Sequence, residues 1–376
     1  MKRIAAILIA FSMLLPFSAS ALSPEELYRD QLTASGAEEV YSQLPEESKE
    51  LLHGFGIDGV EPEDFTALKP GALLTGLIGM AKEQSGGVVA ACGLILAVLL
   101  LGALGASFSG FIREKGMGGA FSVICGGVAC VTLLNPVAAC AGQARRAADG
   151  VAALIGSYAP AYVAVLAAEG RGITASAYGA ALLTASEIAV WILSQVTVPL
   201  FSLSLGVGAA GALSERNRLS GLSVALAKVS GRILTVTVGV FTAILSLQTM
   251  VAVPADSLAL RTAKLSLSSF VPLVGGALGE AFGTVTGCLA TLRSTLGAFG
   301  IAAGTVLILP ALLRCILWSA ALFLTRTAAE MMGVKPIVSL LETVGQGMRA
   351  LIGVLLSMGM LVTVSTALVT LAGRQI

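Results

Sequence analysis

Long apolar runs separated by short polar stretches dominate the chain after residue 87. Each of the clearest runs reaches about the 20 apolar residues that a helix needs to cross a bilayer. These runs lie at 88–111, 120–141, 233–253, 298–324 and 351–372. The sequence beyond residue 70 is therefore typical of membrane-spanning helices.

The region 151–213 is also apolar, and it is interrupted by the charged tripeptide 169–171 and by Pro199. Charges and proline favour breaks between spans, so we expect three helices here. Their predicted ranges are 151–168, 173–193 and 196–213. The whole pattern predicts an all-α, polytopic membrane bundle of about eight spans, within a range of six to nine.

The first 21 residues have the layout of a secretory signal peptide. Lys2 and Arg3 precede an apolar run at 4–17, and the tripeptide Ala-Ser-Ala at 19–21 supplies a small-residue cleavage pattern. An uncleaved first helix is the alternative, but the run is shorter than the roughly 20 residues of a span. Cleavage is therefore favoured, and residue 22 onward starts outside the cytoplasm in either case.

Residues 22–70 predict an acidic extracytoplasmic region of two or three short helices. Ser23 with Glu26 forms a capping-box pattern, and a second helix is indicated by Leu44-Pro45. Fewer than about 50 residues bury little core alone, so these helices are expected to rest on the membrane domain at 71–376 or on a partner. His53, the single histidine of the sequence, has the context of a surface residue at a helix end.

Composition and charge separate this acidic region from the rest. Hydrophobic residues make up 56% of the chain and charged residues 12%, against about 25% charged in soluble domains, which excludes an ordinary soluble enzyme. The net charge of +1 hides an asymmetry, because twelve of the 22 acidic residues fall between Glu25 and Asp64. The densest basic connections, near Arg113 and Arg216, are expected to stay cytoplasmic. An eight-span arrangement then leaves Arg145 outside, against the positive-inside rule.

The segment 255–292 fits neither a span nor an ordinary loop. Its first part, 255–270, has the polar and apolar faces of a helix lying in the membrane interface. Its second part has a glycine at every fourth residue and includes Glu280. These glycines are Gly275, Gly279, Gly283 and Gly287. Such a stripe favours close helix packing within the chain or, as the alternative, a re-entrant or self-associating helix.

Ionisable groups within apolar segments are costly and often functional. Glu187 and Arg314 are a candidate ion pair, either a fixed structural pair or part of a transport path. Glu169 and Glu280 are further candidates, because each follows a Ser-aromatic-X-Pro motif, at 157–160 and 269–272 respectively, which suggests a structural repeat.

The residues of common catalytic and cofactor sites are missing. The six cysteines all lie in apolar segments, which implies no disulfide framework. The glycine-rich sequence at 206–211 matches the dinucleotide-binding motif in its residue spacing. It lacks the structural context of that motif, because an apolar helix rather than a strand is predicted before it. The sequence contains no Walker A motif and no H-E-x-x-H motif, and no histidine lies in 71–376. We therefore expect no enzyme activity, cofactor, metal site or nucleic-acid partner.

Several strings in order along the chain resemble the stage III sporulation protein AE family. They include LPEE at 44–47, SYAP at 157–160 and LLETVG at 340–345. The most specific are ADSLALRTAK at 255–264 and FVPLVGG at 270–276.

The resemblance implies a multi-pass protein of the mother-cell membrane around the forespore, with its N-terminal region in the intermembrane space. It implies a complex with other sporulation membrane proteins, including a secretion-type ATPase and a forespore-membrane partner. The resemblance identifies no catalytic residues.

Two functional hypotheses remain. The first is a non-enzymatic component of the sporulation channel or transport complex that links mother cell and forespore, needed for late forespore development. The second is a stand-alone secondary transporter for a small solute, which Glu187, Arg314 and the possible repeat would suit.

Overall fold

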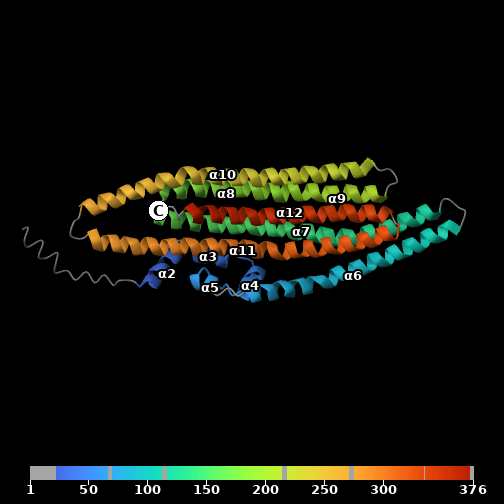
Figure 1. The fold of residues 1–376 in the computed structure, drawn as a ribbon, viewed down its shortest axis with the longest axis horizontal. Coiled ribbons are helices and arrows are strands. Elements are labelled where there is room, and N and C mark those ends of the chain that lie inside the picture. The colour runs from blue at the N-terminus through green and yellow to red at the C-terminus, as the bar shows by residue number, and fades with distance from the viewer. Residues whose placement is uncertain are drawn as a thin grey trace, which may run out of the picture.

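A computed structural model describes the chain over 23–66, 70–111, 117–213, 218–270, 275–333 and 335–372. The predicted signal peptide lies outside the described residues. Within them the protein is helical and contains no strand, so the predicted all-α membrane architecture is confirmed. Figure 1 shows long helices lying side by side in an elongated bundle, with the short N-terminal helices along one flank.

The acidic N-terminal region forms four short helices. They are α2 (Pro24–Ala34), α3 (Ala37–Ser42), α4 (Glu46–Gly54) and α5 (Pro62–Thr66). The predicted capping box starts α2: the Glu26 N–H donates to Ser23 Oγ at 3.2 Å, and the Ser23 N–H donates to Glu26 Oε2 at 2.9 Å. These helices rest on the bundle, since Tyr41 of α3 packs on Phe299 with ring centroids 6.1 Å apart.

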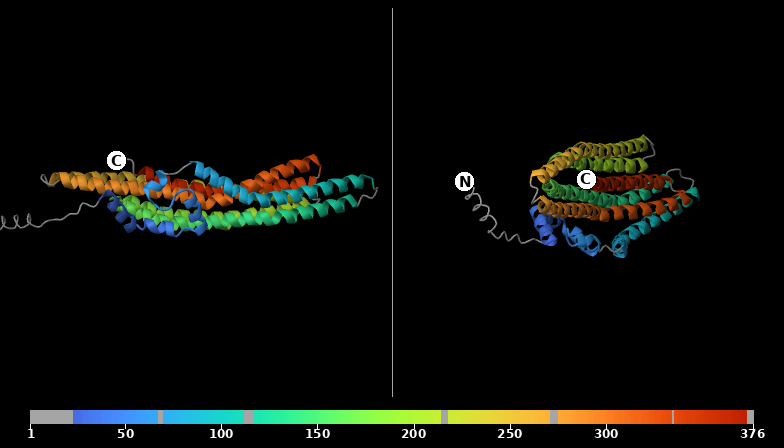
Figure 2. Two further views of the ribbon diagram at one scale, coloured as in Figure 1. Left: turned by 90° about the horizontal axis from the view of Figure 1, so that it is seen from below. Right: turned by 60° about the vertical axis from the view of Figure 1, so that its left-hand side comes forward.

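Six long helical segments form the bundle, and successive segments run in opposite directions (Figures 1 and 2). Five are single helices and one is α8, a π-helical stretch η1 and α9 in succession. Their bounds are α6 (Pro70–Phe111), α7 (Met117–Ala168), α8 (Gly172–Trp191), η1 (Ile192–Thr197), α9 (Val198–Leu213), α10 (Arg218–Phe270), α11 (Gly275–Met331) and α12 (Lys335–Ala372).

Six helices among the described residues are long and apolar enough to span a membrane, which corrects the expected count of about eight to the lower end of its range. The predicted spans 120–141 and 151–168 are two parts of α7, because the alanine-rich stretch between them continues the helix. Pro199 does not end its segment either. The wide turns of η1 precede it and accommodate the proline, which lacks an N–H donor.

The two ends of the bundle differ in charge. We call the end where α6 meets α7, α9 meets α10 and α11 meets α12 the basic end, because Arg113, Arg216 and Lys335 lie at or next to these connections in the sequence. We call the other end, which carries the short helices α2–α5 and the α7–α8 turn, the acidic end. With six spans, Arg145 lies inside α7 rather than in a loop between two spans.

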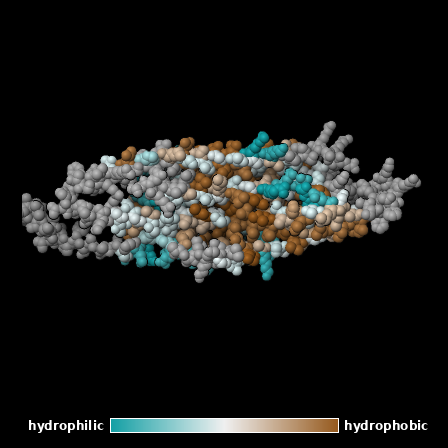
Figure 3. Space-filling model, in the orientation of Figure 1, coloured by the Kyte–Doolittle hydropathy of each residue, from teal (hydrophilic) through white to brown (hydrophobic). Residues whose placement is uncertain are grey.

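Exposed apolar side chains concentrate toward the basic end. Among the described residues, all but four of the large exposed hydrophobic side chains fall in ranges that we call the apolar belt, namely 89–134, 188–203, 222–250, 316–331 and 356–360. Figure 3 shows the same bias, with brown surface in the middle and on the right and paler surface on the left.

The helices are longer than a membrane is thick. The 57 residues of α11 extend about 85 Å at 1.5 Å per residue, whereas the hydrocarbon core is about 30 Å thick. Because α3 packs on Phe299, this level of α11 is covered by the acidic helices rather than by lipid. The bundle therefore has a belt suited to lipid and an extramembrane part at the acidic end.

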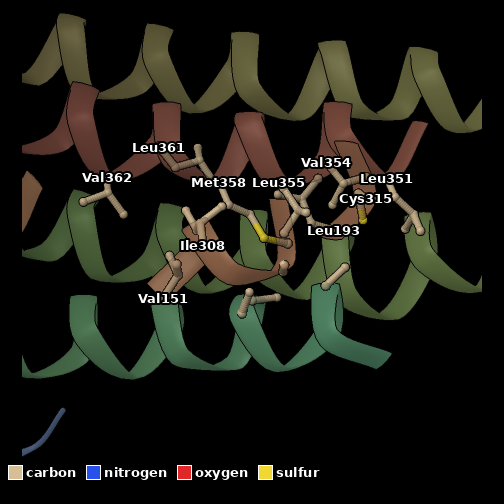
Figure 4. Packing of buried hydrophobic residues seen from close by; sticks show 14 of the residues in the cluster. Val151, Leu193, Ile308, Cys315, Leu351, Val354, Leu355, Met358, Leu361 and Val362 are labelled. Atoms are coloured by element: carbon tan, nitrogen blue, oxygen red, sulfur yellow. The ribbon is translucent and has the colours of Figure 1, made fainter. Parts of the chain in front are cut away.

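The interior between the long helices is filled by apolar side chains. Figure 4 shows Val151 of α7, Leu193 of η1, Ile308 of α11 and Met358 of α12 meeting in one cluster, all of them buried. Interdigitated apolar side chains of this kind fix the positions of the helices relative to one another.

Glycines of α11 allow close contact with α7 and α12, but they are not the glycines of the predicted stripe. A Cβ on Gly300 would lie 2.8 Å from the Tyr158 ring, and one on Gly304 would lie 2.7 Å from Val362. Gly283 and Gly287 are exposed, and a Cβ on either would meet no atom within 4 Å. The side chains around Gly275, Gly279 and Glu280 lie outside the described part of the structure, and 255–270 forms the last turns of α10.

Candidate functional site

A buried group of charged residues begins at the turn between α7 and α8. Gly170 adopts a left-handed φ of 81° and follows Glu169. The Arg171 N–H donates to Leu166 O at 3.0 Å, and the Gly170 N–H donates to Ala167 O at 2.9 Å. This is a Schellman arrangement, which requires glycine at the left-handed position. The turn places Glu169 and Arg171 on either side of this glycine.

Glu169 lies between two arginines. Its Oε2 forms a salt bridge with Arg171 Nε at 3.1 Å and accepts a hydrogen bond from Arg293 Nη1 of α11. The three residues are 7%, 4% and 5% exposed, so all three charges are shielded from solvent by protein. A buried carboxylate between guanidinium groups satisfies the rule that buried charges are paired.

Asp256 of α10 adds a second carboxylate to the group. Its Oδ1 accepts from the Ile173 N–H at 3.1 Å and its Oδ2 from the Thr174 N–H at 2.6 Å. These are free donors of the first turn of α8, so Asp256 caps that helix from a different element. The residue is 3% exposed. We name Glu169, Arg171, Asp256 and Arg293 the ionic cluster.

Three buried tyrosines lie next to the ionic cluster. The rings of Tyr158 and Tyr162 are 5.2 Å apart between centroids, and the Tyr178 hydroxyl donates to Ser365 O of α12. The hydroxyls of Tyr158 and Tyr162 and the Glu169 Oε1 atom have no hydrogen-bond partner within the protein. The cluster thus retains hydrogen-bonding capacity in its interior.

Burial raises the pKa of the Glu169 carboxyl above its ordinary value, and the positive charges of Arg293 and Arg171 lower it part of the way back. Burial also lowers the pKa of Arg171, which the negative charge of Glu169 opposes. The two arginines balance the two carboxylates. Chemically the cluster is an electrostatic tie between the α7–α8 turn, α10 and α11.

The structure places the sequence candidates in different surroundings. Glu169 is at the centre of the ionic cluster. Glu187 is exposed on α8, whereas Arg314 is partly buried on α11 in a cavity with Asn135. No salt bridge among the described residues joins Glu187 to Arg314.

Sequence reasoning missed Arg171, Asp256 and Arg293. Arg171 was visible as a charge in the interruption at 169–171. Asp256 lies in the stretch predicted as an interfacial helix, which continues α10, and nothing in its sequence surroundings marked it as part of a site. Arg293 is 124 residues away from Glu169 in the sequence. No local pattern could have indicated this pair, because only the packing of α11 against α7 brings the two residues together.

These features define a polytopic α-helical membrane protein whose helices are tied at one end by a buried ionic cluster. The sequence profile of the stage III sporulation protein AE family matches residues 66–373, and the chain belongs to this family. The matched range contains the whole ionic cluster and omits nearly all of the acidic N-terminal region.

One curated relative is the stage III sporulation protein AE of Bacillus subtilis (strain 168), which is 23% identical over 250 residues. The aligned region covers 66% of this chain and 62% of the relative, so the chain spans less than two thirds of that protein's length. No solved structure matches the chain.

Proposed function

We propose that this protein is a non-enzymatic membrane component of the sporulation channel or transport complex that links mother cell and forespore, and that late forespore development requires it. Membership in the stage III sporulation protein AE family carries the proposal. The protein acts in this proposal as an assembled subunit rather than as a catalyst.

The packing of the bundle supports a subunit over a pore formed by one chain. Leu193, Ile308 and Met358 fill the space between α7, η1, α11 and α12, and each is buried. A hydrophilic solute would have to displace this core to pass along the axis of a single copy. A path built between chains avoids that cost.

The surface of α8 gives a second argument. Glu187 is an exposed carboxylate beside Ile188 and Trp191, which are 55% and 60% exposed and belong to the apolar belt. A carboxylate facing hydrocarbon is costly, and a neighbouring protein that covers this face of α8 would remove the cost. The exposed carboxylate therefore favours a protein partner on α8.

In the proposed orientation the basic end is cytoplasmic, following the positive-inside rule. In this proposal α2–α5 and the ionic cluster lie in the space between mother cell and forespore. The proposed partners are the other membrane proteins of the complex, including a secretion-type ATPase, and a forespore-membrane protein. They would meet the basic end and the acidic end respectively.

A stand-alone transporter is the second candidate, and the ionic cluster is the observation that favours it. Paired charges beside unpaired buried hydroxyls are elements that carriers use to bind and move small solutes. In this case one purified protein would move a solute by itself.

The test is deletion of the gene in its sporulating host, followed by affinity purification of a tagged copy from sporulating cells. We expect development to stop after engulfment and other sporulation membrane proteins to co-purify. Normal spores after deletion would refute the proposal. Solute uptake into vesicles that contain only this protein, with no co-purifying partner, would establish the transporter instead.

A further inference from the structure

We infer that the junction of α6, α7 and α11 binds a phospholipid with an amine-bearing headgroup, its phosphate on Arg314 and one acyl chain along α6 and α11. This inference is independent of the proposed function. It concerns a part of the molecule about twenty residues along α11 from Arg293 of the ionic cluster.

The headgroup part is a cavity of about 560 Å³ between the three helices. Arg314 and Trp318 line it from α11, Asn135 from α7, and Glu83 and Gln84 from α6. Two of these residues carry opposite charges, and the other three provide polar groups for hydrogen bonds. The rest of the lining, which includes Val88, Pro136 and Ala139, is apolar, so the cavity suits the junction between a headgroup and its acyl chains.

Arg314 is the cation of this cavity and takes part in no salt bridge among the described residues. It is partly buried, and the Oε1 atom of the nearby Gln84 is buried with no hydrogen-bond partner in the protein. A partly buried guanidinium favours an anion, and phosphate matches its fork of donors. The guanidinium therefore offers a phosphate site, and the Gln84 Oε1 acceptor beside it suits a donor such as the ammonium group of the lipid.

The cavity lies where the exposed surface changes from charged to apolar. On α6 the exposed Lys82 and Glu83 are followed by Val89, which is 68% exposed. On α7 the exposed Arg145 is preceded, toward the basic end, by Val131, which is 66% exposed. A change of this kind on two neighbouring helices marks the level of lipid headgroups. This position favours a lipid phosphate over a soluble one.

A second cavity of about 400 Å³ continues toward the basic end. It shares Val88 with the headgroup cavity and runs between α6 and α11. Its lining is almost wholly apolar and includes Cys92, Leu96, Leu317 and Leu324. Leu324 is also 69% exposed in the apolar belt. An acyl chain that extends from a phosphate at Arg314 would enter this cavity.

Glu83 decides the class of headgroup. Its carboxylate lines the same cavity as Arg314, so a second anionic group on the lipid would be repelled there, whereas an ammonium group would be attracted. Phosphatidylethanolamine carries both charges in this arrangement. Phosphatidylglycerol carries the phosphate without the amine, so it should bind the same place more weakly.

The experiment is native mass spectrometry of the full-length protein in detergent, titrated separately with phosphatidylethanolamine, phosphatidylglycerol and free phosphoethanolamine. We expect retention of phosphatidylethanolamine, weaker retention of phosphatidylglycerol and no retention of the soluble headgroup. Arg314→Ala should weaken phosphatidylethanolamine binding about tenfold, the order of one charge-assisted hydrogen bond. Arg349→Ala is the matched control, since Arg349 is an exposed arginine that lines neither cavity.

Two further variants keep the test decisive if Arg314→Ala fails to fold. Glu83→Gln should abolish the preference for phosphatidylethanolamine, and Ala320→Phe, which fills the apolar cavity, should weaken both lipids equally. Unchanged lipid binding in both variants would overturn the inference. So would equal binding of the soluble headgroup, because it would assign the site to a free phosphate compound.

Discussion

Removal of the Glu169 carboxylate tests whether the ionic cluster holds the bundle together. In Glu169→Ala, Arg171 and Arg293 both lose the carboxylate that they share. Both arginines remain buried, at 4% and 5% exposure, and Asp256 is the remaining carboxylate of the cluster. The variant therefore leaves buried positive charge without its partner.

The expected loss of stability follows from this geometry. Breaking a buried ion pair by removing one partner costs about 3–5 kcal/mol, because the remaining charge stays desolvated. For a chain of 376 residues such a loss lowers the unfolding midpoint by about 4–6 °C. Glu187→Ala is the matched control: this glutamate is exposed and joins none of the salt bridges of the described residues, so it should change stability by less than about 0.5 kcal/mol.

The buried cysteines provide the assay. Cys130, Cys140 and Cys315 are free and buried, so a thiol-reactive fluorescent dye labels them only as the protein unfolds in detergent. Heating curves of wild type, Glu169→Ala and Glu187→Ala then give three midpoints. Equal midpoints for the two variants would refute the reasoning. A double variant that also replaces Arg293 by methionine should regain part of the loss, because it removes one uncompensated charge.

Three further predictions concern other positions. Gly300→Leu should lower the unfolding midpoint through the clash described above, by the 1–3 kcal/mol of overpacking or more, whereas Gly283→Leu should not; equal midpoints would contradict the assigned close approach. Asp256→Ala should cost about 1–3 kcal/mol by leaving buried N–H donors of α8 unpaired, measured by the same heating assay, and a wild-type midpoint would argue against its capping role. The hydrogen bond to Asp58 raises the pKa of the exposed His53 above 6.5. The stability that protonated His53 contributes is therefore complete below pH 6.5 and disappears as the pH rises through the folded-state pKa of His53. Because the sequence has one histidine, NMR of histidine-labelled protein should give one titration above that value, and Asp58→Asn should abolish the shift.

The lengths of the apolar runs were enough to predict the helical membrane fold, but not where every helix ends. The sequence suggested a loop near Arg145, yet α7 continues through it because Ala144, Ala147 and Ala148 pack inside the bundle. The Arg145 side chain contacts η1, where its Nη2 donates to Gln195 Oε1 at 3.4 Å. A charged residue in an apolar segment is therefore a weak indication that a helix ends. Small residues beside it are the better indication, because they allow the helix to continue and to pack inside the bundle.

The candidate site shows the same limit at longer range. Glu169 could be selected from the sequence because a charge within an apolar region needs a partner. The arginine partners of Glu169 could not be selected in this way. The sequence favoured a pair of Glu187 and Arg314 instead, and these two residues lie in different surroundings. Opposite charges indicate that pairs exist, but the helix packing decides which residues form them.

The position of the ionic cluster connects stability to the proposed assembly. Arg293 lies on the same helix as Phe299, where α3 covers the bundle, so the cluster belongs to the extramembrane part. A broken cluster should loosen the acidic end while the apolar belt, which lies toward the basic end, still inserts into the membrane. We therefore expect Glu169→Ala protein to reach the membrane in normal amounts but to co-purify with fewer partners from sporulating cells. Loss of the protein from the membrane fraction would instead show that the cluster is needed for insertion, and would contradict the separation of the two parts.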